Sequence, residues 1–240
     1  MFEYQKVNLI GMTQPIEKNL FSEDIISYCA RVSNPQNQTK YDTSEKLLKY
    51  LIINKHWSPF EMVNVVLEIE TTRDIARQIL RHRSFAFQEF SQRYADPTQD
   101  LGFVQREARL QDIKNRQNSI QNDNVKLNKD WLETQDYLID VIKTNYNWAI
   151  QNGIAKEQAR AILPEGLTIS RMYMNGSLRS WIHYCLLRMG NGTQKEHQDI
   201  AEKCWKILIQ EYKFLNAISQ KILNEIIEDI NILESDKRGK

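Results

Sequence analysis

Glycine is scarce in this chain, with eight glycines in 240 residues. The sequence has no G-x-G-x-x-G run, the fingerprint of a Rossmann dinucleotide site, whose glycines make the tight turn and let the backbone approach a pyrophosphate. It also has no G-x-x-x-x-G-K-[S/T] loop, which disfavours a P-loop nucleotide hydrolase. Neither of these two common nucleotide-binding folds is therefore expected.

Cysteine and histidine are also few. The three cysteines, Cys29, Cys185 and Cys204, are an odd number without a C-x-x-C pair. This pattern argues against a disulfide framework and a cysteine zinc site, and it suits a reducing cytoplasm. Cys185 lies in an apolar helical pattern and is expected to be a packing residue. The four histidines form neither an H-E-x-x-H motif nor a tight ligand cluster, so no metal site is expected.

Net charge and long apolar runs are nearly absent. Lysine and arginine total 32 against 31 aspartate and glutamate residues, which gives a formal net charge of +1. The overall charge therefore gives no sign of a protein that coats nucleic acid. No stretch approaches the roughly 20 apolar residues of a membrane span, and the N-terminus is a poor signal peptide. We expect a cytoplasmic protein with no membrane and no nucleic-acid partner.

Hydrophobic periodicity predicts a helix-rich α+β domain that spans residues 1–240 and contains a small, mostly antiparallel or mixed sheet. Ser22 is predicted to cap one helix, and Asp42 with Glu45, and Thr193 with Glu196, have capping-box spacing. A polar segment at about 105–130 is predicted to be a surface insertion, partly helical or mobile. Strands are expected at 4–10, 62–70 and 167–174, and helices at 22–33, 42–56, 72–83, 131–150, 154–163 and 177–189, with final helices after Thr193.

Residues 73–94 concentrate arginines and aromatic residues in this nearly neutral chain. On a helix, Arg73, Arg77 and Arg81 would lie on one face, where like charges at that spacing repel each other weakly. A solvated basic face explains the arginines but not the three phenylalanines that follow. Arginine beside aromatic rings suits a planar ligand that carries a phosphate. A platform for single-stranded RNA is the alternative, because such proteins combine the same residue types.

The same stretch carries a recognisable signature. Arg81-His82-Arg83, seven residues and then Ser91 form an R-H-R-x7-S pattern, preceded by "HWSPFE" at 56–61 and "ARQILRHR", and followed by "ARAILP" and "LRSWIHYCLLR". These blocks occur in order between about residues 56 and 197, and they resemble the corresponding segments of the flavin-dependent thymidylate synthases. Ser91 has no evident histidine or aspartate partner nearby, and a serine without a base is a weak nucleophile, so Ser91 is interpreted as a hydrogen-bond donor.

The resemblance implies methylation of dUMP to dTMP. Methylenetetrahydrofolate would supply the carbon, and FAD reduced by NADPH would supply the hydride. It also implies a homotetramer whose active sites are built by several subunits. Arg188 would be the catalytic residue, because a fixed guanidinium can stabilise negative charge that develops on the uracil ring. No enzyme cysteine is then required.

The resemblance also assigns the other site residues. Ser177 stands where the family commonly has asparagine, and Asn175 lies two residues away, so either could fill that position. A flavin-side role for His56 and a packing role remain equally open. The FAD contacts would be Ser58, Arg81, His82, Arg83, Glu89, Ser177, Leu178, Arg179 and His183. The dUMP contacts would be Gln78, Ile79, Leu80, Arg81, Glu89, Phe90, Ser91, Gln92, Arg93, Arg160 and Arg188.

Overall fold

The centre of the molecule is a four-stranded sheet in the order β1-β2-β6-β3, in which every neighbouring pair is antiparallel. The computed structural model describes residues 3–190 and 192–217. The helix-rich α+β class and the small antiparallel sheet are therefore confirmed. The central strands are β1 (Lys6–Met12), β2 (Asn64–Thr72), β6 (Ile169–Ser177) and β3 (Phe85–Glu89).

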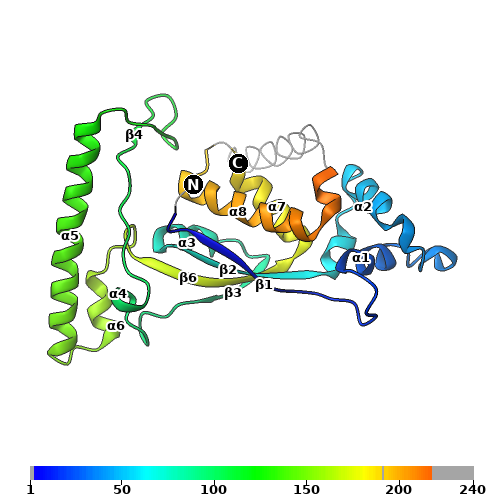
Figure 1. Cartoon of the computed structure of the whole chain (residues 1–240), viewed down its shortest axis with the longest axis horizontal. Helices are drawn as coiled ribbons and strands as arrows, with labels where there is room; N and C mark the ends of the chain where they lie inside the picture. Colours follow the sequence, from blue (N-terminus) through cyan, green and yellow to red (C-terminus); the bar gives the residue numbers. More distant parts are fainter. Residues whose placement is uncertain (1–2, 191, 218–240) are drawn as a thin grey trace, which may run out of the picture.

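Helices α7 and α8 cover one face of this sheet, and other helices lie beyond both of its ends (Figure 1). Helix α8 packs on β1, β2 and α7, while α1 and α2 lie together at the far end from α5. No helix among the described residues is long and apolar enough to cross a membrane. The α-helices are α1 (Ser22–Ala30), α2 (Ser44–Ile53), α3 (Arg73–Ile79), α4 (Pro97–Asp100), α5 (Val125–Gln151), α6 (Lys156–Ala159), α7 (Leu178–Met189) and α8 (Lys195–Glu211).

Alternating residues of β2 build the core as the sequence predicts. Val65, Leu67 and Ile69 are at most 1% exposed and face the covering helices. The fully buried Trp181 of α7 donates its indole N–H to the Val65 carbonyl at 3.0 Å, which fixes α7 against β2. A second, smaller apolar cluster lies under α5 and includes Tyr146 and Leu163. The main core therefore supports α7 directly.

Strand β3 is an element that the sequence analysis did not predict. Phe85 pairs with Gly176 of β6, and a Cβ on Gly176 would lie 2.3 Å from the Phe85 ring. The ring also packs edge-on against Trp181, with centroids 4.9 Å apart. Phe85 and Phe87 thus face the core, so their aromatic character serves packing.

The predicted N-cap at Ser22 is wrong. Phe21 occupies the cap position, and its backbone N–H donates to the Asp24 carboxylate at 3.0 Å. Ser22 is already helical, and its hydroxyl donates to the Thr13 carbonyl.

The predicted capping box of Asp42 and Glu45 is wrong as well. Asp42 lies in a 3₁₀ turn, Tyr41–Thr43, and α2 begins only at Ser44. The Ser44 hydroxyl donates to the Asp24 carboxylate at 2.9 Å, which links α2 to α1.

The third cap, Thr193 with Glu196, is wrong for a different reason. Helix α8 begins at Lys195, and Gln194 occupies the cap position. Glu196 is fully buried, and its carboxylate accepts from the side chain of Gln194 at 3.0 Å. The Glu196 carboxylate, which the spacing assigned to a cap, is therefore engaged in tertiary contacts instead.

The predicted helix at 72–83 ends early. Helix α3 stops at Ile79, and the chain turns through Arg81-His82-Arg83 into β3. Arg73, Arg77 and Arg81 therefore do not form one exposed face: Arg73 is 8% exposed, and Arg81 lies beyond the helix. The predicted helix at 154–163 is likewise shorter, as α6 followed by a 3₁₀ turn, Arg160–Ile162.

The polar segment at about 105–130 forms two structures. Strands β4 (Leu110–Gln111) and β5 (Ser119–Ile120) make a short hairpin, and α5 begins at Val125, six residues earlier than expected. Asn124 caps α5 by accepting from the Leu127 N–H at 3.0 Å. Gln135 of α5 is 1% exposed and exchanges two 2.8 Å hydrogen bonds with the Arg106 backbone. We call residues 105–124 the arm segment.

The last predicted helices lie partly outside the described residues. After α8 the structure has a 3₁₀ helix, Lys213–Ala217, and the charged tail follows beyond it.

Candidate active site

The signature Arg81-His82-Arg83 forms the turn between α3 and β3. The His82 backbone N–H donates to the Ile79 carbonyl at 3.0 Å, and the Phe85 N–H donates to the His82 carbonyl at 3.3 Å. Arg81 and Arg83 are exposed, while His82 is half-buried. The turn therefore presents two guanidinium groups outward and one imidazole inward.

His82 meets Arg188 inside the molecule. The Arg188 Nε donates to His82 Nε2 at 2.9 Å, although the two residues are 106 positions apart. Arg188 lies in the last turn of α7, and the Tyr184 ring from the same helix packs edge-on against His82 at 4.9 Å. Helix α7 therefore joins the predicted catalytic residue to the signature.

Burial controls the charge of this pair. Burial of the imidazole, and then the Arg188 charge, lower the pKa of His82 to about 4. The ring is therefore neutral near pH 7 and can accept the Arg188 hydrogen bond. A neutral partner orients the guanidinium without cancelling its positive charge.

A second contact joins two other blocks of the sequence. Glu61, from the "HWSPFE" block, accepts from the Ser177 hydroxyl and from Arg179 Nη1, the latter at 2.9 Å. Ser177 is also the N-cap of α7 and accepts from the Ser180 N–H at 3.2 Å. Ser177 is thus engaged at the start of α7, while Asn175 is exposed on β6.

The aromatic residues of these blocks also meet. The Trp57 and His183 rings pack edge-on with centroids 4.7 Å apart. Burial and the nearby Arg179 lower the pKa of His183, and Glu61 opposes the shift. Ser58 and His56 are exposed, and the ring of His56 lies 6.1 Å from that of Tyr50.

The residues from Glu89 to Arg93 lie at the other end of β3. Glu89 accepts from the Ser170 hydroxyl at 2.9 Å and pairs with Arg73 at 3.5 Å. Burial of Arg73 lowers the pKa of that guanidinium, the nearby Glu89 opposes this shift, and Arg160 adds to it. Glu89 and Arg160 therefore both lie within electrostatic range of Arg73.

Ser91 and Arg93 follow Glu89 at this end of β3, and we call the residues from Glu89 to Arg93 the second group. The Ser91 hydroxyl accepts a long bond of 3.4 Å from the Arg93 N–H. Arg93 pairs with Glu157 of α6 at 3.4 Å and lies over the Tyr94 ring. Gln92 is 4% exposed, and its buried Nε2 has no hydrogen-bond partner among residues 3–190 and 192–217. Phe90 is half-buried, and its N–H donates to the Arg171 carbonyl at 2.8 Å.

Within one chain, the residues around Arg188 and His82 lie apart from the residues between Glu89 and Arg93. Strand β3 has five residues, and strands rise about 3.4 Å per residue, so its ends lie roughly 14 Å apart. Arg188 and His82 lie beyond one end, and Ser91 lies beyond the other. A single subunit therefore does not gather all the predicted dUMP contacts at one point.

Three predicted contacts have apolar side chains that the core occupies. Ile79 and Leu178 are fully buried, and Leu80 packs against the core. Any role of these residues at a ligand must come from their backbone atoms. Cys185 is also fully buried, and burial raises the pKa of its thiol well above the ordinary value, as expected of a packing cysteine.

The sequence analysis missed a buried set of polar side chains behind the signature. His197 of α8 lies between Tyr184 and Gln78: its Nε2 is 3.1 Å from the Tyr184 hydroxyl, and its Nδ1 is 3.2 Å from Gln78 Oε1. Burial, followed by the charges of Arg188 and His82, lowers the pKa of His197 to about 3. The only sequence signal was a histidine on the apolar side of an amphipathic helix.

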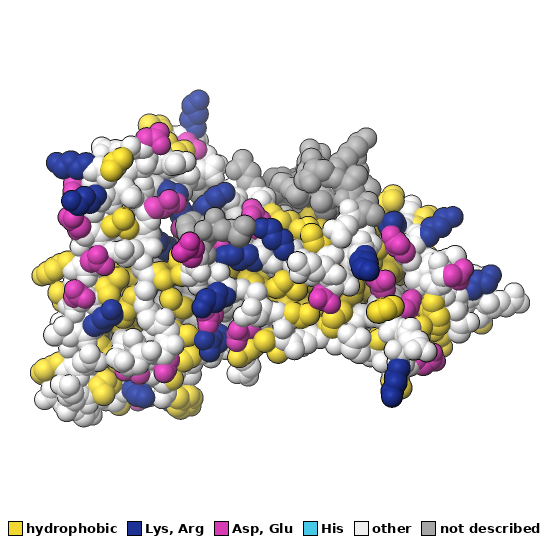
Figure 2. Space-filling model, in the orientation of Figure 1, with side chains coloured by type: hydrophobic (Ala, Val, Ile, Leu, Met, Phe, Trp, Pro, Cys, Tyr) yellow, Lys and Arg dark blue, Asp and Glu magenta, His cyan; other side chains and the backbone are white. Residues whose placement is uncertain are grey.

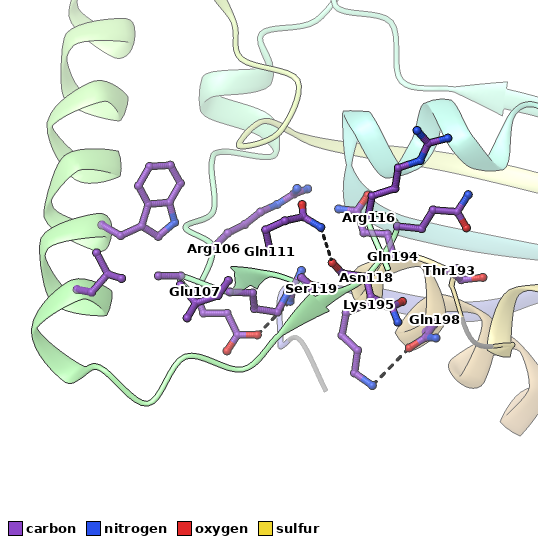
Figure 3. Close-up of a pocket in the computed structure, with 16 residues that line it drawn as sticks. Arg106, Glu107, Gln111, Arg116, Asn118, Ser119, Thr193, Gln194, Lys195 and Gln198 are labelled. Atoms are coloured by element: carbon purple, nitrogen blue, oxygen red, sulfur yellow. Dashed lines mark hydrogen bonds and ion pairs between the residues drawn. The ribbon is translucent and has the colours of Figure 1, made fainter. Parts of the chain in front are cut away.

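A cavity of about 690 Å³ lies between the arm segment and the N-terminal end of α8 (Figure 3). None of the predicted site residues lines it. Arg106, Arg109 and Arg116 line it from the arm segment, while Gln194 and Lys195 line it from the start of α8. The Gln194 amide connects this cavity to α3, because Gln78 Nε2 donates to its oxygen at 2.8 Å.

Comparison with known proteins agrees with this arrangement of blocks. Residues 16–212 match the model of a family described as thymidylate synthase complementing protein. The chain is 48% identical over 205 residues to a probable flavin-dependent thymidylate synthase of Paramecium bursaria Chlorella virus 1, covering 85% of this chain and 94% of that protein. The chain belongs to the flavin-dependent thymidylate synthase family. It is also 47% identical over 215 residues to the flavin-dependent thymidylate synthase of Synechocystis sp., covering 88% of this chain and 97% of that one.

A solved structure shares this fold. The structure of the UMP/dUMP methylase PolB from Streptomyces cacaoi, bound with 5-Br UMP, has a TM-score of 0.71 to this chain at 22% identity. The match covers 86% of this chain and 89% of that chain. The two chains therefore share their overall fold over most of their length.

The alternative of an RNA platform loses two of the aromatic rings on which it rested. Phe85 and Phe87 pack against the core, so these rings cannot stack bases. Arg77 pairs with Glu165, and Arg93 pairs with Glu157.

Proposed function

We propose that this protein methylates dUMP to dTMP, with methylenetetrahydrofolate as carbon donor and NADPH-reduced FAD as hydride donor. The observation that carries the proposal is the 2.9 Å contact between Arg188 and His82. It joins the signature to a guanidinium that burial and a neutral partner hold in place. The names of the relatives support the same chemistry.

The residues present fit a phosphate-bearing flat ligand such as FAD. Arg81 and Arg83 are exposed on the signature turn, and half-buried Arg179 and His183 lie on α7. Guanidinium groups bind phosphate oxygens through paired N–H donors, and an exposed turn lets them approach a large ligand. Ser58, Glu89, Ser177 and Leu178 remain predicted contacts. When bound, the flavin would supply the hydride.

Arg188 would act on the nucleotide. For C5 of uracil to attack the incoming carbon, negative charge must develop on N3 and the ring carbonyl oxygens. A guanidinium fixed by His82 can stabilise that charge without reorganising during the reaction. His82 is neutral near pH 7, so it would not compete with the nucleotide for the Arg188 charge.

The second group of residues would bind the nucleotide from another subunit. The two groups lie roughly 14 Å apart in one chain, at opposite ends of the five-residue β3. We therefore propose that Ser91, Gln92, Arg93 and Arg160 of one subunit meet Gln78 and Arg188 of a neighbour. Ser91 would donate a hydrogen bond to dUMP, and Arg93 and Arg160 would hold its phosphate.

A homotetramer is supported by an exposed apolar face on α5. Trp131, Leu138, Val141 and Trp148 are spaced by seven, three and seven residues, which places them on one side of the helix. They are between 39% and 59% exposed. Figure 2 shows hydrophobic side chains along the edge of the molecule where α5 lies. Contiguous exposed apolar side chains of this kind mark protein interfaces.

The direct test is anaerobic incubation of the protein with dUMP, methylenetetrahydrofolate, FAD and NADPH, followed by chromatographic assay for dTMP. We expect a yellow protein with releasable flavin, and dTMP only when dUMP, methylenetetrahydrofolate and NADPH are present together with bound or added FAD. A colourless protein that forms no dTMP and binds RNA with a steep salt dependence would refute the proposal.

A further inference from the structure

A chain of side-chain hydrogen bonds runs from the arm segment to Gln78 of α3, three residues before the signature. Arg109 of the arm segment pairs with Glu196 of α8. Gln194 Nε2 donates to the other Glu196 oxygen at 3.0 Å, and Gln78 Nε2 donates to Gln194 Oε1 at 2.8 Å. His197 then contacts Gln78 Oε1 at 3.2 Å. Figure 3 shows Gln194, the middle link of this chain, among the residues that line the cavity.

The Arg109 end fixes the direction of every bond. A carboxylate only accepts hydrogen bonds, so Gln194 must turn its N–H group toward Glu196 and its oxygen toward Gln78. Gln78 must then donate through Nε2 and accept from His197 through Oε1. This requires a proton on Nδ1 of His197, which leaves Nε2 to accept from the Tyr184 hydroxyl.

Burial makes this direction costly to reverse. Glu196 and His197 are fully buried, and Tyr184 is 2% exposed. A buried carboxylate is expensive unless it is paired and hydrogen-bonded, and Arg109 with Gln194 meets both needs. Arg109 also pairs with Glu107 at 3.0 Å, which holds its guanidinium to the arm segment.

We propose that Glu196, held by Arg109, is a positioning residue that acts through Gln194 to fix the amide of Gln78 toward the nucleotide. The inference rests on the proposed function, in which Gln78 contacts dUMP. With one Nε2 hydrogen given to Gln194, Gln78 keeps a second N–H. That group is a donor aimed by the chain at an acceptor on the nucleotide, such as a ring carbonyl or phosphate oxygen. The arm segment thereby contributes to the site without touching the substrate.

Two variants test the chain at different links. Glu196→Gln replaces the fixed acceptor with an amide that can face either way. Gln194→Met breaks the link to Gln78 but leaves the pair between Arg109 and Glu196 intact. Glu202→Gln is the matched control, because it makes the same change at an exposed position of α8.

The first readout is nucleotide binding and turnover. Losing one oriented hydrogen bond should raise the dUMP dissociation constant and KM roughly two- to tenfold, with kcat within about twofold of the parent. Glu202→Gln should match the parent. If Gln194→Met also keeps the parental dissociation constant, the inference is wrong, whatever Glu196→Gln does to folding.

The second readout does not depend on activity. Solid-state ¹⁵N NMR of histidine-labelled protein should show His197 neutral and protonated on Nδ1, with its signals assigned by their loss in His197→Gln. Both chain variants should shift this toward a mixture of tautomers. A parental His197 protonated on Nε2 would overturn the inference. If the parent shows the expected tautomer but forms no dTMP, the proposed function is wrong, whereas the direction of the hydrogen-bond chain is confirmed.

Discussion

His197 should make the stability of this protein unusually sensitive to mild acid. Its pKa is lowered from 6.5 to about 3 in the folded protein, because the ring is buried beside Arg188 and His82. Below pH 6.5 the unfolded chain therefore binds a proton that the folded protein does not bind. Stability contributed by the neutral ring is present above pH 6.5 and is lost progressively as the pH falls toward 3.

The size of the effect follows from the pKa difference. As the pH falls from 7 to about 4.5, His197 becomes protonated in the unfolded state but not in the folded state. Because pH 4.5 lies roughly 2 units below the pKa of the unfolded state, this difference lowers the free energy of unfolding by about 3 kcal/mol. Carboxylates also titrate in this range, so the parent must be compared with a variant. His197→Gln keeps a hydrogen-bonding side chain but removes the titrating ring.

The assay is urea unfolding at the two pH values, followed by circular dichroism at fixed protein and FAD concentrations. The parent should lose about 3 kcal/mol more of its free energy of unfolding than His197→Gln over this range. Equal losses in the two proteins would show that His197 is protonated in the folded protein. The hydrogen-bond chain through a buried, neutral His197 would then be wrong.

Three further predictions concern the nucleotide contact, the sheet and the assembly. Ser91→Ala should raise the dUMP dissociation constant two- to tenfold with little change in kcat; a covalent Ser91–uracil adduct would contradict this. Gly176→Ala should lower the free energy of unfolding by about 1–3 kcal/mol, because the new methyl meets Phe85; unchanged thermal melting would be inconsistent with that contact. Light scattering should show an active tetramer that Trp148→Asp dissociates, and an active monomer would exclude shared sites.

The local pattern predicted several elements well. The alternation of Val65, Leu67 and Ile69 identified β2 and its buried face, because a strand repeats every two residues. The apolar pattern before Arg188 identified α7. Strand boundaries moved by two or three residues, since pairing with neighbouring strands and not local preference decides where a strand ends.

Strand β3 was missed although its sequence also alternates. The phenylalanines of this stretch were interpreted together as suited to a planar ligand, whereas the sheet uses Phe85 and Phe87 as core residues opposite β6. Two predicted cap residues, Ser22 and Glu196, failed because tertiary contacts engage their side chains, whereas Asp42 lies in a turn before α2 begins. Cap preferences are worth only about 0.5–2 kcal/mol, so tertiary hydrogen bonds readily recruit those side chains. Glu196 shows this most clearly.

The site could be predicted only in part. Ordered motifs indicated Arg188 and the signature, but the contact between them spans 106 residues and depends on how α7 packs on the sheet. The chain from Arg109 to Tyr184 joins the arm segment, α3, α7 and α8. No local pattern encodes such a chain, because each member resembles an ordinary surface or helix residue until the fold buries it.

Arg188 offers the most direct test of the central claim. The measurement is dTMP turnover of Arg188→Ala at saturating dUMP, with flavin content and melting temperature recorded beside it. Arg31→Ala, which removes an arginine bound to Lys40 and Thr43 at the far end of the molecule, is the control. Losing a preorganised donor typically costs a hundred- to a thousandfold in rate. We predict that loss for Arg188→Ala, with little rescue by Arg188→Lys and with FAD retained. Turnover within a fewfold of the parent would contradict the account.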